Sequence, residues 1–137
     1  MRSFFDTNVL VYMFDEGKRG KQRAMQLFED AIDQRQALLS TQVLQEFFVV
    51  VTRRLSPPMP HELAARVIRA FAALQIIRVD PDIIVNAIEL TRRYRFSFWD
   101  GLIIEAALRG GAETLYTEDL QPGQVIETLQ VENPFLS

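Results

Sequence analysis

The sequence predicts an α/β protein, a three-layer α/β/α sandwich with a central parallel sheet. Short apolar runs with strand character alternate along the chain with longer segments whose apolar residues recur at helical spacing. This alternation is typical of parallel sheets that are covered by helices on both faces. The length of 137 residues fits one domain, and no linker, repeat or low-complexity tract divides it. We therefore expect a single domain over residues 1–137.

The N-terminal region predicts one strand followed by two helices. Residues 3–6 form a short, mainly apolar run with strand character. Thr7 or Asn8 can then cap a short helix that reaches about Phe14. A second helix is expected to begin near Gly20, because the apolar residues after it recur at helical spacing. These residues are Ala24, Met25, Leu27, Phe28, Ala31 and Ile32.

Periodicity decides the next segment, where a run of Phe and Val alone would suggest a strand. Residues 37–40 predict a strand, after which Thr41 is expected to cap a helix. The apolar residues of that segment lie at i, i+3, i+4, i+7 and i+11, which favours a helix. The proline-rich residues 56–60 predict a loop, and residues 61–74 a further helix. The apolar residues are Leu44, Phe47, Phe48, Val51 and Leu55.

The second half of the chain continues the alternation of strands and helices. Pro81 suits the first turn of a helix that ends near Tyr94. Ser97 is a favoured helix cap, and the pair Gly110 and Gly111 is expected to end the helix that Ser97 begins. The expected strands of this half lie at residues 76–79, at residues 114–117 and near residue 131.

Four acidic residues lie beside apolar segments, where carboxylates are rarely buried unless they are paired or bind a cation. Two follow expected strands, and two are expected in the first turns of helices that begin at the same sheet edge. In open α/β sheets, ligands bind beyond the carboxyl ends of the strands, where the strand order switches. The four acids are therefore expected to meet in one metal site. They are Asp6 and Asp119, after strands, and Glu46 and Asp100, in helices.

Three of the four acids also have an ordinary structural interpretation. Asp6 is a favoured N-cap, and Asp100 suits the positive end of a helix dipole. Glu46 has no such explanation, because a capping box needs Ser or Thr three residues before it and the chain has a valine there. Asp119 is the most open of the four, since Glu118 competes for its role and a plain surface turn would also explain it.

A bound cation would relieve the repulsion among clustered carboxylates. Hard Mg²⁺ or Mn²⁺ takes oxygen ligands and keeps several waters, so a few carboxylates suffice. We expect Asp6, Asp100 and Asp119 to hold the metal, and Glu46 to complete the shell or orient the attacking water. The metal lowers the pKa of its bound water, so no histidine base is needed. The only histidine, His61, is expected to be exposed and inert.

Composition narrows the class of protein. The chain has no cysteine, which excludes disulfides, thiolate nucleophiles and cysteine zinc sites. It has no apolar run long enough to span a membrane, and Asp6 interrupts the apolar start that a signal peptide needs. We therefore expect a cytoplasmic protein with no membrane partner.

Charge at first argues against a nucleic-acid partner, because the formal net charge is −3. Neutralising the four site acids would make the balance positive, and most of the 15 basic residues are arginines, which suit bidentate phosphate contacts. The basic residues also cluster, although such clusters are equally typical of solvated helix faces. The clusters are Lys18, Arg19, Lys21 and Arg23; Arg53 and Arg54; and Arg92, Arg93 and Arg95.

Four segments, in the same order along the chain, resemble the PIN domain family and, within it, the VapC-type toxins of prokaryotic toxin–antitoxin pairs. The resemblance covers essentially the whole chain. It implies a PIN-like α/β/α sandwich, an Mg²⁺- or Mn²⁺-dependent ribonuclease that cleaves RNA, a homodimer, and a tightly bound antitoxin that blocks the site. The segments are residues 4–12 (Phe-Phe-Asp-Thr-Asn-Val-Leu-Val-Tyr), 45–47 (Gln-Glu-Phe), 97–103 (Ser-Phe-Trp-Asp-Gly-Leu-Ile) and 115–120 (Leu-Tyr-Thr-Glu-Asp-Leu).

The resemblance also assigns residues to the site. It matches the family's small polar residue after the first acid to Thr7, and its hydroxyl before the last acid to Thr117. Asn8 and Glu118 are expected to support the site, with Asp119 favoured over Glu118 as the fourth acid. The residues that match the family's acidic set are Asp6, Glu46, Asp100 and Asp119.

Three other functions stay open. A phosphoaspartyl hydrolase also carries Asp after its first strand, but it usually needs a second Asp where this chain has Asn8. A structure-specific DNA nuclease has the same broad fold, although such chains are usually longer. A non-catalytic binding module on this fold tends to lose its acids, whereas all four are present here.

Aromatic and apolar side chains near the acids allow two interpretations. Arginines near the rim would hold an RNA backbone, and Trp99 or Tyr94 could stack on an unpaired base. For Trp99 we expect packing in the core instead. The apolar residues 47–51 could likewise form a partner groove or a dimer face, but a role in the core is expected.

Overall fold

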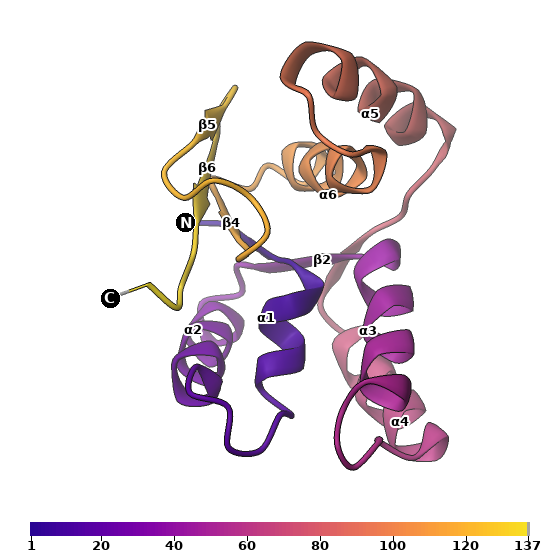
Figure 1. Ribbon diagram of the computed structural model, residues 1–137. Coiled ribbons are helices and arrows are strands. Elements are labelled where there is room, and N and C mark those ends of the chain that lie inside the picture. Colours follow the sequence, from indigo (N-terminus) through magenta and orange to yellow (C-terminus); the bar gives the residue numbers. More distant parts are fainter. Residues whose placement is uncertain (137) are drawn as a thin grey trace.

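A six-stranded sheet forms the middle layer of the molecule, in the order β3-β2-β1-β4-β6-β5. The computed structural model describes residues 1–136 and is drawn in Figure 1. The strand pairs are parallel except β5 and β6, so the predicted parallel sheet is confirmed, with one antiparallel edge strand added. The strands are β1 (Ser3–Phe5), β2 (Ala37–Ser40), β3 (Gln75–Ile77), β4 (Thr114–Tyr116), β5 (Val125–Ile126) and β6 (Leu129–Glu132).

Helices cover both faces of the sheet, which confirms the three-layer sandwich. Figure 1 shows α1 to α4 on one side of the sheet and the pair α5 and α6 on the other. No helix among residues 1–136 has both the length and the apolar character needed to cross a membrane. The helices are α1 (Thr7–Tyr12), α2 (Lys21–Asp33), α3 (Thr41–Arg53), α4 (His61–Phe71), α5 (Pro81–Tyr94) and α6 (Phe98–Arg109).

The start of α3 differs from the prediction. Ser40, not Thr41, is its cap, because Ser40 has the extended backbone of a cap and its hydroxyl accepts the Val43 N–H at 3.3 Å. The Thr41 hydroxyl instead accepts the Val79 N–H at 3.1 Å, which ties α3 to the segment after β3. Glu46 lies in the second turn of α3, so its expected place in the first turn is wrong.

Aromatic rings fill the core beneath the sheet. Phe47 packs edge-on against Phe71 with ring centroids 5.3 Å apart, and Phe28 meets both Phe71 and Phe5 in the same way, at 5.6 and 5.0 Å. This cluster joins β1 to α2, α3 and α4. Edge-to-face packing stabilises such pairs beyond the burial of their area, so β1, which leads into the site, is held rigidly from below.

The order of the strands places a crevice between β1 and β4. From β1 the chain continues to β2 and then β3 on one side, while β4 and β6 lie on the other side of β1. Asp6 and Thr117 are the first residues after β1 and β4, so both predicted strands end one residue early. The Asp6 N–H donates to the Tyr116 carbonyl at 3.0 Å. This is the switch point at which α/β sheets bind ligands.

Candidate active site

Asp6 lies at the bottom of the crevice and is only 5% exposed. Its Oδ1 accepts the Thr7 N–H at 2.7 Å, and its Oδ2 accepts the Thr117 hydroxyl at 2.8 Å. Asp6 is therefore also the N-cap of α1, as the ordinary interpretation holds. Capping and a place in the site are compatible here, because the carboxylate also contacts a residue that follows β4.

Burial raises the pKa of Asp6 from 3.8 to about 7. The hydrogen bonds from Thr117 and Thr7 act in the opposite direction, because they stabilise the charged form, and the negative charges of Asp119 and Glu46 raise the pKa further. Without a cation, Asp6 would thus be about half protonated near neutral pH. Two other acids lie close enough to disfavour its charge.

Both carboxylate oxygens of Glu46 accept hydrogen bonds. Its Oε1 accepts the Thr7 hydroxyl at 2.9 Å, and its Oε2 accepts the Gln42 side-chain N–H at 3.1 Å. Gln42 also donates to the Trp99 carbonyl at 3.2 Å, so it joins α3 to α6. Sequence reasoning missed Gln42, although it lies one helical turn before Glu46 and therefore on the same face of α3.

Asn8 connects the first and last parts of the site. Its side-chain amide donates to Asp119 Oδ2 at 3.0 Å and to the Thr117 hydroxyl at 3.3 Å, while its Oδ1 accepts the Glu118 N–H at 3.4 Å. The Asp119 N–H in turn donates to the Thr117 hydroxyl at 3.1 Å. The chain after β4 is thereby fixed to α1, with Asp119 turned toward the acids.

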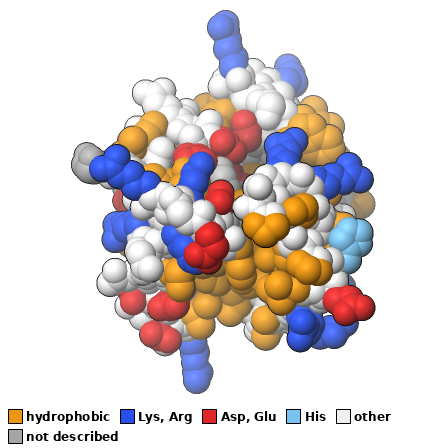
Figure 2. Space-filling model, turned by 60° about the horizontal axis from the view of Figure 1, so that its bottom comes forward, with side chains coloured by type: hydrophobic (Ala, Val, Ile, Leu, Met, Phe, Trp, Pro, Cys, Tyr) orange, Lys and Arg blue, Asp and Glu red, His pale blue; other side chains and the backbone are white. Residues whose placement is uncertain are grey.

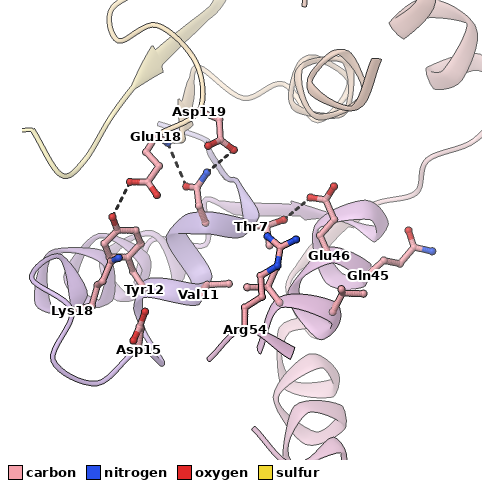
Figure 3. A pocket seen from close by; sticks show the side chains of 13 residues that line it. Thr7, Val11, Tyr12, Asp15, Lys18, Gln45, Glu46, Arg54, Glu118 and Asp119 are labelled. Atoms are coloured by element: carbon pink, nitrogen blue, oxygen red, sulfur yellow. Dashed lines mark hydrogen bonds between the residues drawn. The ribbon is translucent and has the colours of Figure 1, made fainter. Parts of the chain in front are cut away.

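Glu118 points in a different direction from Asp119. Its Oε2 accepts the Tyr12 hydroxyl at 2.8 Å, and Figure 3 shows the two side chains meeting beside α1. Burial and then this hydrogen bond raise the pKa of Tyr12 to about 12, so Tyr12 remains a donor at neutral pH. The charge of Asp119, in contrast, raises the pKa of both Asp6 and Asp100. The geometry thus favours Asp119 as the fourth acid.

Asp100 approaches the same acids from α6. It lies in the first turn of that helix, where its N–H donates to the capping hydroxyl of Ser97 at 3.1 Å. Burial raises the pKa of the Asp100 carboxyl, and the negative charges of Asp119 and Glu46 raise it further. A hydrogen bond between the Ser97 and Asp100 side chains lowers it. Glu46 and Asp119 therefore act on both Asp6 and Asp100, and the four predicted acids share one electrostatic environment.

The carboxylates suit a hard cation, but they do not form a ready-made cage. Within residues 1–136, no three Asp, Glu or His side chains lie close enough together to hold a metal ion directly. Mg²⁺ keeps several waters and is often held by only one or two carboxylates, so a looser set of oxygen donors fits it. A divalent charge would also favour the ionised form of Asp6, whose pKa its neighbours raise.

A cavity of about 620 Å³ opens beside the acids, between α1 and α3. Four acids line it, together with an apolar wall of Val11, Val49 and Val50, and the cations Lys18 and Arg54. The face drawn in Figure 2 carries acidic side chains near its upper centre and a broad hydrophobic stretch below them. The lining acids are Asp15, Glu46, Glu118 and Asp119.

The structure corrects the expected burial of two apolar features. Trp99 is 63% exposed, so core packing is wrong for it, because its position on α6 faces away from the sheet. In the segment 47–51, Phe47 and Val51 are buried but Val49 is 44% exposed, so only one side of α3 belongs to the core. His61 is exposed as predicted, with its ring 5.2 Å from that of Phe48.

Residues 3–125 match the family model of the PIN domain. A search of curated proteins finds no match.

Solved structures with the same fold include a toxin and a toxin–antitoxin complex. VapC20 of Mycobacterium tuberculosis, a toxin that cleaves the sarcin-ricin loop, is 23% identical and has a TM-score of 0.70, over 85% of this chain and 89% of its own. A toxin–antitoxin complex from Klebsiella pneumoniae is 23% identical with a TM-score of 0.73, over 97% and 98%. FitAcB from Neisseria gonorrhoeae is 18% identical with a TM-score of 0.69, over 97% and 98%.

Proposed function

The chain belongs to the PIN domain family, and from that premise we propose that it is a metal-dependent endoribonuclease, the toxin of a type II toxin–antitoxin pair. One observation carries the proposal. Acids from four distant segments share one environment at the switch point of the sheet, where burial and acidic neighbours raise the pKa of Asp6 to about 7. Perturbed carboxylates that line a cleft are typical of catalytic sites.

Asp6, Asp100 and Asp119 would hold Mg²⁺ or Mn²⁺. The cation would supply a nucleophile at neutral pH by acidifying a bound water, and it would offset charge on the phosphate. The protein would hold the carboxylate oxygens of these acids in place by hydrogen bonds. Thr117 and Thr7 hold the two oxygens of Asp6, and Asn8 holds Asp119.

Glu46 would orient the attacking water. Each of its oxygens accepts one hydrogen bond, from Thr7 and from Gln42, which leaves further lone pairs free to accept from a water. Because both bonds come from buried side chains, the carboxylate does not need to reorganise before reaction. Glu46 also lines the open cavity, where a phosphodiester can enter.

The proposed partner is a cognate antitoxin that covers the cavity. The acids favour a cationic plug such as an arginine side chain, and the apolar wall of Val11, Val49 and Val50 suits a hydrophobic segment next to it. The toxin–antitoxin complexes among the similar structures support this partner. A homodimer is also proposed, for which exposed apolar side chains of α5, among them Val85 and Ile88, offer one surface.

Cleavage of RNA tests the proposed function. Purified protein should cleave single-stranded RNA with Mg²⁺ or Mn²⁺ and stop with EDTA, while Asp6→Asn and Asp100→Asn should each lose most of the activity. Asp82→Asn is the matched control, because Asp82 is an exposed first-turn acid outside the site and should change nothing. Undiminished cleavage by both site variants would rule out this mechanism.

Two further functions have distinct outcomes in the same assay. Preferential cleavage of branched or flapped DNA in competition with RNA would indicate a structure-specific DNA nuclease. A folded protein that cleaves neither, and that binds no Mn²⁺ in calorimetry, would indicate a non-catalytic binding module.

A further inference from the structure

A second cavity, of about 800 Å³, continues from the first around Tyr12. Tyr12 and Lys18 line both cavities, so the two are adjacent and separated by little more than these side chains. The two differ in charge, because acids line the first, whereas no carboxylate of residues 1–136 lines the second. The second cavity is lined by Tyr12, Lys18, Arg19, Gly20, Arg23, Pro134, Phe135 and Leu136.

The cations of this cavity are free to bind an anion. Lys18, Arg19 and Arg23 are exposed, and none of them forms an ion pair within residues 1–136. Their neighbour Lys21, in contrast, is paired with Glu16. Three unpaired cations on one concave surface create a local positive potential in a chain whose net charge is −3.

Aromatic rings give this basic cavity a defined wall. Tyr12 stacks on Phe135 with ring centroids 3.8 Å apart and an angle of 17° between the planes. A side chain at Gly20 would collide with both rings, so the glycine is what lets the stack lie against the start of α2. The Lys18 ammonium lies 5.2 Å from the Tyr12 ring, which orients that cation by a cation–π contact.

Tyr12 also connects the basic cavity to the acids, because its hydroxyl donates to Glu118 beside Asp119. A nucleic-acid strand whose phosphodiester lies at the acids would therefore have its neighbouring nucleotides next to Lys18. Arginine suits phosphate because its planar fork of donors matches phosphate oxygens. The positive charge of the second cavity would repel a cationic segment of an antitoxin. A polyanion such as RNA, in contrast, fits both cavities once a metal ion offsets the negative charge of the acids at the first.

We propose that the cavity formed by Lys18, Arg19 and Arg23 binds the backbone phosphates of the RNA strand next to the bond that is cut. The inference rests on the proposed ribonuclease function and names the path of its substrate. Binding there would be electrostatic and independent of sequence, because phosphate contacts carry no base information.

Salt-dependent binding tests the proposal, with an Asp100→Asn background to prevent cleavage. Fluorescence anisotropy measures the binding of a labelled oligouridylate to three proteins. The first carries Asp100→Asn alone, the second also carries K18A/R19A/R23A, and the third carries R66A/R69A/R78A instead of that triple change. Both triple changes remove three positive charges from exposed positions, but the second triple lies outside both cavities. Thermal unfolding checks that all three proteins are folded.

We expect the cavity triple variant to bind RNA at least about tenfold more weakly. We also expect a shallower dependence of log K on log salt, since each lost phosphate contact on a single strand lowers the slope by about 0.7. The control triple variant should change both quantities much less. Equal losses in the two triple variants would overturn the proposal, because only net charge would then matter.

Two outcomes separate this inference from the proposed function. If the unmodified protein cleaves RNA but the cavity triple variant keeps its affinity and salt slope, the cavity proposal fails and the ribonuclease stands. If the unmodified protein neither cleaves nor binds RNA, both fail. Retained RNA binding together with lost binding of the cognate antitoxin would also overturn the proposal and assign the cavity to the protein partner.

Discussion

Asp6 shows how one residue can have a structural and a chemical role at once. It caps α1, and its second oxygen accepts the hydroxyl of Thr117 across the switch point. The sequence predicted its place in the site from the strand before it. Its burial was not evident from sequence, because burial depends on how α1 and the chain after β4 close over it.

The raised pKa of Asp6 predicts an unusual pH dependence of stability. The folded pKa of about 7 lies above the ordinary 3.8, so between these values the folded protein holds more protons than the unfolded chain. The free energy of unfolding of the metal-free protein should therefore gain a contribution as pH falls through 7 and lose it as pH rises. The size of this contribution is on the order of a few kcal/mol.

Urea unfolding in EDTA at several pH values measures this effect. Asp6→Asn should flatten the dependence between pH 4 and 7, because an amide does not titrate, while Asp82→Asn should keep it. A variant at Asp6 with the same pH profile as the unmodified protein would show that another group is responsible.

Asp119 and Glu118 are adjacent in sequence but have separate environments, which gives a second prediction. Asp119→Asn should reduce RNA cleavage by about 100-fold or more, as expected for loss of a residue that holds the metal. Glu118→Gln should cost much less, because the amide oxygen can still accept the Tyr12 hydroxyl. Rates under single-turnover conditions decide between them, and the opposite ranking would make Glu118 the fourth acid.

Sequence reasoning could favour Asp119 but could not settle the choice. The contacts that favour Asp119 come from Asn8 and Tyr12, which lie more than a hundred residues earlier in the chain. Gln42 was missed for a related reason. Its importance depends on a bond to the Trp99 carbonyl, and no local pattern indicates such a partner.

Among the elements, α6 carries Asp100 in its first turn, and the start of this helix was predicted correctly. Ser97 caps the helix and accepts the N–H of Asp100, so one hydroxyl both begins the helix and fixes the acid's backbone. The cap of α3 was predicted one residue too late, at Thr41. Two neighbouring hydroxyl residues can both cap, and only the backbone conformation of Ser40 distinguishes them.

Removal of the α6 cap should affect stability and activity together. Ser97→Ala should lower the free energy of unfolding by about 1 kcal/mol, the usual cost of a lost N-cap. It should also reduce RNA cleavage, because the first turn that carries Asp100 would fray. Ser97→Thr keeps a hydroxyl and should retain most of both properties. Urea unfolding and initial rates measure the two effects, and a normal rate in a destabilised Ser97→Ala protein would contradict the link.

Over the whole molecule, alternation of strands and helices was enough to predict the layers and the crevice. A right-handed parallel arrangement brings the ends of distant strands to one edge, so the four acids could be grouped before any contact was known. This reasoning did not predict the antiparallel strand β5. It joins β6 through a tight turn in which Glu127 has φ 54°, and this turn has no glycine or asparagine to mark it.

Exposure could also not be derived from the apolar pattern alone. The segment from Phe96 to Ile104 is apolar at most positions. Its apolar residues in the later part, Leu102, Ile103 and Ile104, are buried, but Trp99 is left 63% exposed. Which side of a uniformly apolar helix faces solvent depends on the tertiary packing of α5 against it. Gly101 allows that packing, since a side chain there would approach the Ala87 carbonyl to 3.0 Å.

Binding of Mn²⁺ tests most directly the central claim that acids from four segments form one cation site. Isothermal titration calorimetry of the unmodified protein at pH 7.5 should show saturable binding, which weakens as pH falls below 7 because Asp6 must lose its proton. Asp6→Asn and Asp119→Asn should each weaken binding at least about tenfold, as loss of a ligand implies, and Asp82→Asn should not. Absence of Mn²⁺ binding by the folded protein, or equal binding by all three variants, would contradict the claim.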